Sequence, residues 1–555
     1  MSSTTRRVLT FAAVLSCFAV HSVAYSQISS QKKVATGSVS GRVTIHAKGR
    51  SGIIVGLRVA EVRGQSSLLW KAVTDADGNY QITNVPAGNY QIAPVAPAFV
   101  VSDTDAFRRA GKTLVITEGE TVTGINFSIV RGGVITGRVT QTDGSPVIEE
   151  RVTVVPVNQA NQRYVSSSFQ TDDRGVYRVF GLPAGEYKVS VGQNEMAQFS
   201  PANRGRPVYE RVFYPDATNI TEAKAITVDE GSEATNIDIT VSPSAPGFAA
   251  SGVVVEGETN KPVPNIRFGL QRVSANRRSP PMIGIVATSG SQGEFRLENL
   301  APGKYAIFIL PQQHTDLRAD SNQFDVIDHD VSGLIVKASK GASITGTLVL
   351  EGITDQRVLA QVSQLRLFVY VRSERGTGGS GFGQTSTIGT DGSFRLGGLQ
   401  AGIASFNLGF QDRTAGTGFV ISRIEREGLD HTRGLSIEAG EQIAGVKIVV
   451  VYGTGTVRGT VKIENGPDLP EVRLLVRLTK TGAGSANLRP QEADARGRFL
   501  LEGVPAGVYD LHVSAFVPGS RARMPSTKQS ITVNDGAVTE VDLTLNMAPN
   551  PTPAP

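Results

Sequence analysis

Apolar and polar residues alternate in short stretches along most of this chain. In residues 236–241 every second side chain is apolar, and similar stretches follow a glycine turn at 118–129, 230–241, 439–451 and 535–545. Because successive side chains of a strand point to opposite faces, one face packs on a core and the other meets water. No stretch keeps a helical period over the length of a helix. The pattern therefore predicts an all-β chain of antiparallel Greek-key β-sandwiches with about seven short strands each.

The strand pattern repeats, and each copy opens on a strand flanked by two glycines. These openings lie at 37–44, 133–140, 247–254, 341–348 and 455–461. Each copy then reaches a hairpin motif, in which a glycine is followed two residues later by Tyr or Phe; the motifs lie at 74–80, 171–177, 289–295, 389–394 and 493–499. An aspartate in such a turn can bond the backbone two residues on, and glycine accepts a positive φ. The aromatic residue should point into the core.

A third landmark, Pro-Ala-Gly-x-Tyr or a variant of it, follows each hairpin. It lies at 86–90, 183–187, 301–305, 400–402 and 505–509, and predicts a chain reversal that starts another strand. The turn glycines recur about every 100 residues, which indicates autonomous domains rather than a solenoid. We therefore expect a first repeat over 27–131, a second with an insertion over 132–243, a third over 244–338, a fourth over 339–452 and a fifth over 453–547. Residues 548–555 form a Pro-rich tail predicted to be disordered.

These three landmarks together resemble the carboxypeptidase regulatory-like domain, which is related in fold to transthyretin-like (prealbumin-like) and collagen-adhesin B-type modules. The resemblance extends over nearly all of the chain after its first residues. It departs in the third repeat, whose hairpin lacks Asp, and in the fourth, where 403–406 replaces the usual strand start. The resemblance implies small sandwiches that act as folding, spacer or binding modules, and it implies no catalysis.

The first 26 residues have the features of a secretory signal peptide. Arg6 and Arg7 precede an apolar run at 8–20, which is too short to cross a bilayer, and Ala24 and Ser26 are small residues at a cleavage site. We expect cleavage after Ser26 and export to the periplasm, outer surface or medium. The alternative is a lipid on Cys17, since 14–17 resembles a lipobox. No later stretch is apolar enough for a transmembrane helix.

Composition narrows the classes of partner. The formal net charge is +5 over 555 residues, and no basic stripe with interleaved aromatics predicts nucleic-acid binding. Cys17 is the one cysteine, so the mature chain is predicted to lack disulfides and thiol chemistry. Segment 106–113 loosely matches a phosphate-binding loop and segment 376–381 a dinucleotide-binding glycine pattern, but no helix is predicted after either of them. We therefore predict no cofactor and no catalytic residue.

Metal binding has two weak candidates. Asp325, Asp328, His329 and Asp330 are close in sequence, although a solvated loop accounts for them as well. The hairpin aspartates have a spacing seen in calcium ligands, but the third hairpin keeps its turn without any Asp. Turn formation explains all five hairpins, and no metal site is predicted.

The function that the sequence favours is that of a noncatalytic envelope, surface or secreted protein used as spacer, scaffold or adhesion module. One alternative is polysaccharide binding, for which exposed aromatics are the candidates: Trp70, Tyr209, Phe213 and Tyr214. Anchoring in a core or loop is the other interpretation of these four side chains. A further alternative is an accessory module of an exported peptidase or receptor system. Contacts between repeats are expected to contribute little.

Overall fold

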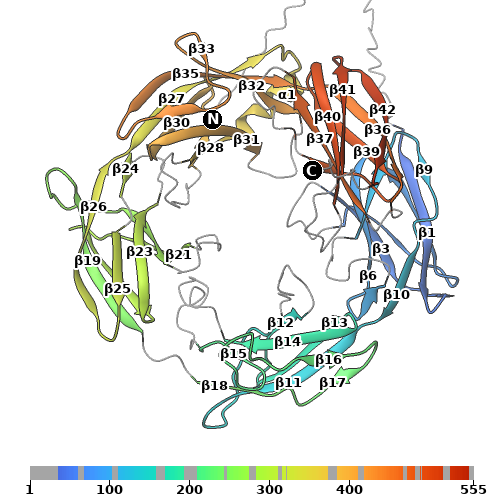
Figure 1. The fold of residues 1–555 in the computed structure, drawn as a ribbon, viewed down its shortest axis with the longest axis horizontal. Coiled ribbons are helices and arrows are strands. Elements are labelled where there is room, and N and C mark those ends of the chain that lie inside the picture. Colours follow the sequence, from blue (N-terminus) through green and yellow to red (C-terminus); the bar gives the residue numbers. More distant parts are fainter. Residues whose placement is uncertain are drawn as a thin grey trace, which may run out of the picture. The chain divides into compact units, whose positions relative to one another are not determined.

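The computed structural model confirms the all-β class, and almost every element in Figure 1 is a strand. It describes residues 35–60, 68–102, 111–157, 169–192, 209–242, 247–273, 283–310, 316–319, 322–372, 384–410, 418–466, 472–481, 488, 490–516 and 525–548. The predicted signal peptide, Cys17 and most of the C-terminal tail lie outside these residues. One short helix, α1 (Gln356–Leu359), and one 3-10 turn, η3 (Val362–Gln364), are present in the described part.

The strands of the first two predicted repeats are as follows. The first repeat has β1 (Gly37–Ile45), β2 (Lys48–Gly49), β3 (Ile54–Val59), β4 (Trp70–Val73), β5 (Asn79–Val85), β6 (Gly88–Val95), β7 (Phe99–Val101), β8 (Lys112–Ile116), β9 (Thr121–Val122) and β10 (Phe127–Arg131). The second has β11 (Gly133–Gln141), β12 (Thr153–Pro156), β13 (Val176–Leu182), β14 (Gly185–Val191), β15 (Val212–Phe213), β16 (Ile226–Val228), β17 (Glu233–Ala234) and β18 (Ile239–Val241).

The remaining strands continue the same order. The third repeat has β19 (Phe248–Glu256), β20 (Arg267–Arg272), β21 (Ile283–Thr288), β22 (Glu294–Leu300), β23 (Gly303–Ile309), β24 (Leu317–Arg318), β25 (Asn322–Val326) and β26 (Val331–Lys340). The fourth has β27 (Ala342–Glu351), β28 (Leu365–Arg372), β29 (Gln384–Thr387), β30 (Ser393–Leu399), β31 (Gly402–Phe410), β32 (Phe419–Arg426), β33 (Leu429–Asp430), β34 (Leu435–Ile437) and β35 (Gln442–Tyr452). The fifth has β36 (Gly455–Glu464), β37 (Arg473–Lys480), β38 (Gln491–Glu492), β39 (Arg498–Val504), β40 (Gly507–Phe516), β41 (Ser526–Val533) and β42 (Val538–Asn546).

Each repeat contributes two sheets that pack around apolar side chains. In the fifth repeat, one sheet has the order β39-β36-β42 and the other β38-β37-β40-β41. Five hydrophobic clusters are formed in the described chain, and each draws its residues from within one predicted repeat. The exact boundaries of the repeats stay a prediction.

The sheet that contains the opening strand of each repeat is mixed, which differs from the purely antiparallel pairing expected, whereas the other sheet is antiparallel. The opening strand of each repeat pairs antiparallel with the strand after the hairpin and parallel with the closing strand. In the fifth repeat, for example, β36 and β42 form a parallel ladder from Thr456↔Val538 to Glu464↔Asn546. A parallel pair needs a long crossover, and the whole remainder of the repeat supplies it.

The second glycine of each opening lets the first and last strands approach closely. A Cβ on Gly137 would stand 1.9 Å from the Ile237 carbonyl oxygen and 2.9 Å from the Tyr177 hydroxyl oxygen. Tyr177 is buried and donates to that same carbonyl at 2.6 Å. The contact at Gly459 is equally close, 1.7 Å from the carbonyl oxygen of Val541. No residue with a side chain fits here without moving the backbone.

The predicted hairpin chemistry is confirmed. In the second repeat, one carboxylate oxygen of Asp172 accepts from the backbone N–H groups of Arg174 at 2.9 Å and Val176 at 2.8 Å, and Gly175 has φ 75°. The third repeat lacks the aspartate, and there Glu294 accepts from the Gln292 N–H at 2.7 Å. A carboxylate from the far side of the turn thus replaces the missing Asp.

The Pro-Ala-Gly-x-Tyr turn is closed by its own tyrosine. Tyr187 is buried and its hydroxyl donates to the Pro183 carbonyl at 2.7 Å. The same bond closes three other turns: Tyr90 to Pro86, Tyr305 to Ala301 and Tyr509 to Pro505. In the fourth repeat β31 still begins at Gly402, with Ala404 buried at the position of the tyrosine.

Candidate functional site

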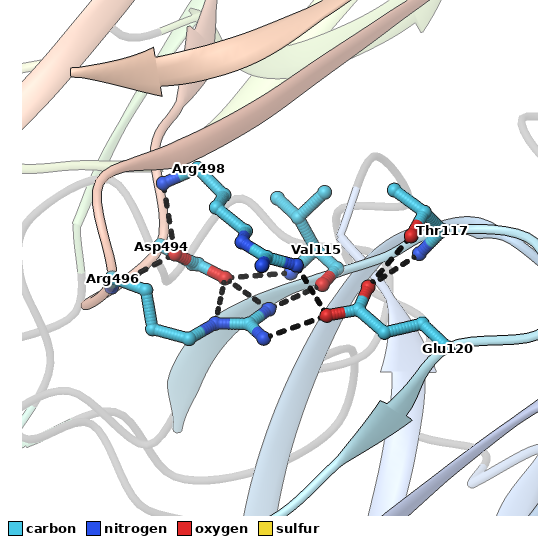
Figure 2. A network of polar contacts seen from close by, with 6 residues as sticks. All are labelled: Val115, Thr117, Glu120, Asp494, Arg496 and Arg498. Carbon is cyan, nitrogen blue, oxygen red and sulfur yellow. Dashed lines mark hydrogen bonds and ion pairs between the residues drawn. The ribbon is translucent and has the colours of Figure 1, made fainter.

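A network of polar contacts joins the first repeat to the fifth (Figure 2). Its first-repeat side is β8, an edge strand of the sheet β4-β3-β6-β8, together with the turn that follows it. The Glu120 carboxylate closes this turn by accepting from the backbone N–H of Thr117 at 2.8 Å and from its hydroxyl at 2.9 Å. The carboxylate is thereby held beside the open edge of β8.

The fifth-repeat side is the hairpin that precedes β39. Asp494 accepts from the backbone N–H groups of Arg496 at 2.8 Å and Arg498 at 3.0 Å, which is the turn chemistry of the other repeats. Its second oxygen accepts from the Arg496 guanidinium at 2.7 and 3.0 Å. Only 1% of the Asp494 side chain is exposed, so this turn is shielded from solvent.

The two sides meet at Val115 and Glu120. The Val115 N–H donates to Asp494 at 3.3 Å, and its carbonyl accepts from Arg496 at 2.6 Å. Arg496 also contacts Glu120 at 2.9 Å, and Arg498 donates to the same oxygen. An edge strand exposes unpaired N–H and C=O groups, and here both groups of Val115 are satisfied by another repeat. We call these residues, together with Thr117, the joint.

A second contact extends the joint beyond the charged groups. The side-chain amide of Asn89 is buried and donates to the Leu500 carbonyl in β39 at 2.9 Å. Asn89 is the variable residue of the first Pro-Ala-Gly-x-Tyr turn. The turn residues of one repeat therefore contact the return strand of another.

The electrostatics of the joint are balanced, because two carboxylates face two guanidinium groups. Partial burial disfavours the charged form of Glu120, but the hydrogen bonds from Thr117 and the charges of Arg496 and Arg498 outweigh it. The pKa of Glu120 is therefore held below its ordinary value. With the carboxylate ionised and the guanidinium groups always charged, the joint offers charge pairing and hydrogen bonds rather than a proton donor.

Of the four aromatic residues proposed as ligand contacts, Trp70 lies in the first repeat and the other three lie in the second. Trp70 is half-buried and meets Tyr90 edge to face, with ring centroids 5.4 Å apart. Tyr209 and Phe213 are each only 6% exposed, and Tyr214 packs against the hydrophobic cluster of the second repeat. These positions agree with anchoring in a core or loop. Ligand contact by any of the four stays a prediction.

The acidic residues considered for metal binding have other partners. Asp330 accepts from the Ala249 N–H at 2.8 Å, and Asp328 contacts His329 at 2.6 Å. Among the hairpin aspartates, the pKa of Asp75 is lowered, first by the hydrogen bond from the Asn79 backbone. Within the described ranges, no group of three or more His, Cys, Asp or Glu side chains is arranged to hold a metal ion.

Comparison with known proteins finds one family that matches part of the chain. The model of the carboxypeptidase regulatory-like domain matches residues 134–242. The second repeat is therefore similar to this domain. The matched region spans β11 to β18 and includes the Asp172 hairpin and the Tyr187 turn described above. None of the curated proteins matches the chain.

Several solved structures align with the chain at low identity. A streptococcal ancillary pilin is 14% identical over 55% of this chain and 99% of its own, with a TM-score of 0.24. The TIE protein of Bacillus anthracis is 14% identical over 72% of this chain and 69% of its own, with a TM-score of 0.16. The major pilin subunit BcpA of Bacillus cereus is 10% identical over 55% and 99%, with a TM-score of 0.15.

In the part of the chain that the structure describes, no helix is both long and apolar enough to cross a bilayer.

Proposed function

We propose that this protein is a noncatalytic scaffold of the cell envelope, cell surface or surrounding medium, built from tandem carboxypeptidase regulatory-like sandwiches. The N-terminal segment supports export, and the recurring landmarks support five modules of one kind. The polar residues that recur in the repeats bond turns, as Asp172 and Tyr187 do. They act in folding rather than in a reaction.

The observation that carries this proposal is the joint. In the joint, Asp494 and Arg496 of the fifth-repeat hairpin contact Val115 and Glu120 of the first repeat. A spacer or scaffold has to present its modules at defined positions, and charge-assisted hydrogen bonds between distant repeats give such definition. An accessory role beside an exported peptidase or receptor would use the same property.

Export is tested by expressing the full chain with a C-terminal tag and sequencing the N-terminus of the mature protein. We expect the mature chain to begin at Gln27 and to be found outside the cytoplasm. A Cys17→Ala variant should be exported and cleaved in the same way, whereas a lipoprotein would begin at Cys17 and lose processing in that variant. Mature protein found only in the cytosol would contradict the proposal.

The noncatalytic role is tested on the purified mature chain. We expect no hydrolysis of peptide or glycan substrates above that of an unrelated β-sandwich protein purified in parallel. Hydrolysis that disappears when one particular side chain is replaced would identify an active site and overturn this part of the proposal.

A further inference from the structure

The outer face of one sheet in the fourth repeat carries two exposed aromatic side chains. In β28 the residues Leu365, Leu367, Val369 and Val371 are buried, so the residues between them face outward. Phe368 is 39% exposed and Tyr370 is 50% exposed. Alternate residues of a strand lie about 7 Å apart, so the two rings stand next to each other on one face.

Most of the side chains around this pair are polar and uncharged, and Ile403 of β31 is an apolar one. On one side Phe368 lies opposite Asn407 and Tyr370 opposite Ser405 in β31. On the other side, Thr385 and Thr387 of β29 have the same orientation. The described residues of this face include no carboxylate; the charged ones are two arginines at the ends of β28, Arg366 and Arg372.

The equivalent positions in the other repeats are not aromatic. Each repeat has one strand that begins at the glycine of its third landmark: β6, β14, β23, β31 or β40. The compared positions are the residues that pair with the fifth and the third residue after that glycine. The pairs are Gly56 and Arg58, Thr153 and Val155, Gly269 and Gln271, Phe368 and Tyr370, and Arg477 and Thr479. The fold thus accepts small, aliphatic, polar or charged residues here, and sandwich formation does not require two rings.

Packing explains part of the pair. The edge of the Phe368 ring stands 2.7 Å from where a Cβ on Gly409 would be, so the ring covers this glycine of the neighbouring strand. Such a cover stabilises a glycine in a strand. Tyr370 has no such role in the sheet, because it lies opposite Ser405 and half of its surface is in solvent. Packing within the sheet therefore does not account for the Tyr370 ring, whose exposed half is available to a ligand.

We propose that the face made by Phe368, Tyr370, Asn407, Ser405 and Thr385 binds a polysaccharide. The C–H faces of pyranose rings stack on aromatic rings, and their hydroxyl groups pair with amide and hydroxyl side chains. The two rings and the flanking Asn, Ser and Thr residues supply both kinds of contact on an open face. This inference goes beyond the scaffold function, because a scaffold does not need it.

The uncharged polar side chains beside the rings favour a polysaccharide as the occupant. Asn407, Ser405 and Thr385 offer amide and hydroxyl groups to sugar hydroxyls, and the charged residues of β28 lie toward its two ends. Neutral chains would use the aromatic and hydroxyl groups alone, while chains that contain uronic acids would also meet Arg372. The shared chemistry is a pyranose chain, and the test separates the two types.

The test uses affinity electrophoresis of the full mature chain in gels that contain a neutral polysaccharide (dextran, xyloglucan or laminarin) or a uronate polysaccharide (polygalacturonate or alginate). We expect at least one gel to retard the wild type, and Tyr370→Thr to weaken retardation about tenfold, the value of one lost stacking contact. Retardation by uronate gels alone, lost also in Arg372→Gln, would identify an acidic chain.

Two controls separate binding from folding. The variants Arg477→Ala and Thr479→Ala change the equivalent face of the fifth repeat and should bind like the wild type. Tyr370→Thr keeps a residue that favours strands, and its far-UV spectrum and melting curve should match those of the wild type. The proposal is overturned if no gel retards the wild type, if Tyr370→Thr binds as well as the wild type, or if a protein partner occupies this face instead.

Discussion

The hairpins of the second and fifth repeats have the same local chemistry and different surroundings. Both place Asp, then Arg two residues later, then Gly: Asp172-Asp173-Arg174-Gly175 and Asp494-Ala495-Arg496-Gly497. In both, the Asp carboxylate accepts from two backbone N–H groups and contacts the guanidinium of the Arg. The Asp172 and Arg174 side chains are 38% and 72% exposed, whereas those of Asp494 and Arg496 are 1% and 30% exposed.

This difference shows that a turn motif determines the turn but not its role. In the second repeat the Arg174 guanidinium pairs with Asp172 of its own hairpin and is largely exposed, and such exposed pairs contribute little to stability. In the fifth repeat the Arg496 guanidinium also bonds Val115 and Glu120 of the first repeat. Removing one partner of a shielded charge pair leaves the other unsatisfied, which is costly.

The largest effect on stability is expected from replacing the turn glycine that both hairpins contain. Gly175 and Gly497 both have φ 75°, and a Cβ would stand 2.4 Å from the Val139 carbonyl oxygen and 2.2 Å from that of Val461. Replacing either glycine by Ala should destabilise its repeat by about 3 kcal/mol. Urea unfolding followed by hydrogen exchange in each repeat of the full chain would measure the loss.

The matched controls for this prediction are Gly144→Ala and Gly536→Ala. Both glycines have positive φ, but no atom lies within 4 Å of the added Cβ. Only the backbone strain remains, so we expect a loss of about 1 kcal/mol. Equal losses in all four variants would show that the contact with the opposite strand does not matter.

A smaller effect, confined to the joint, is expected from Arg496→Ala. The change leaves Asp494 and the Val115 carbonyl without their guanidinium partner, and should destabilise the joint by about 2 kcal/mol. Exchange of the β8 amides in the full chain should become faster. Arg174→Ala is the control, and it should leave both the second repeat and β8 unchanged. If both variants behave alike, the fifth hairpin is as independent as the second.

Local chemistry explains why so much of the fold was predictable. The hairpin of Asp172 and Gly175 and the turn of Tyr187 are decided within a few residues, so the sequence shows them directly. The contact between Arg496 and Glu120 joins residues 376 positions apart. Nothing near Arg496 distinguishes it from Arg174, so the joint could not be predicted from the motif. The parallel pairing of opening and closing strands was missed for the same reason.

The aromatic face of the fourth repeat is a different case, because its signal is in the sequence. In β28 four aliphatic residues alternate with Arg366, Phe368, Tyr370 and Arg372. Since alternate residues share a face, the two rings must lie on the face of the sheet that points away from the core. By contrast, the candidate ligand contacts Trp70, Tyr209 and Phe213 are buried in whole or in part. Position in a strand was a better guide to exposure than aromatic density in an insertion.

The smallest expected effect concerns pH and separates the joint from the hairpin of the second repeat. Glu120 and Asp172 both have a lowered pKa, Glu120 from an ordinary value of 4.5. A carboxyl with a lower pKa in the folded state stabilises that state at pH above its unfolded value, and this stabilisation is lost as pH falls through the folded pKa. From about pH 7 to about pH 3.5, intrinsic-rate-corrected exchange of the β8 amides should therefore accelerate in the wild type more than in Glu120→Gln. Asp172→Asn should retain the full wild-type response at β8, because Asp172 bonds only its own hairpin in the contacts described above. A response in Glu120→Gln equal to that of the wild type would show that ionised Glu120 does not hold the first repeat to the fifth.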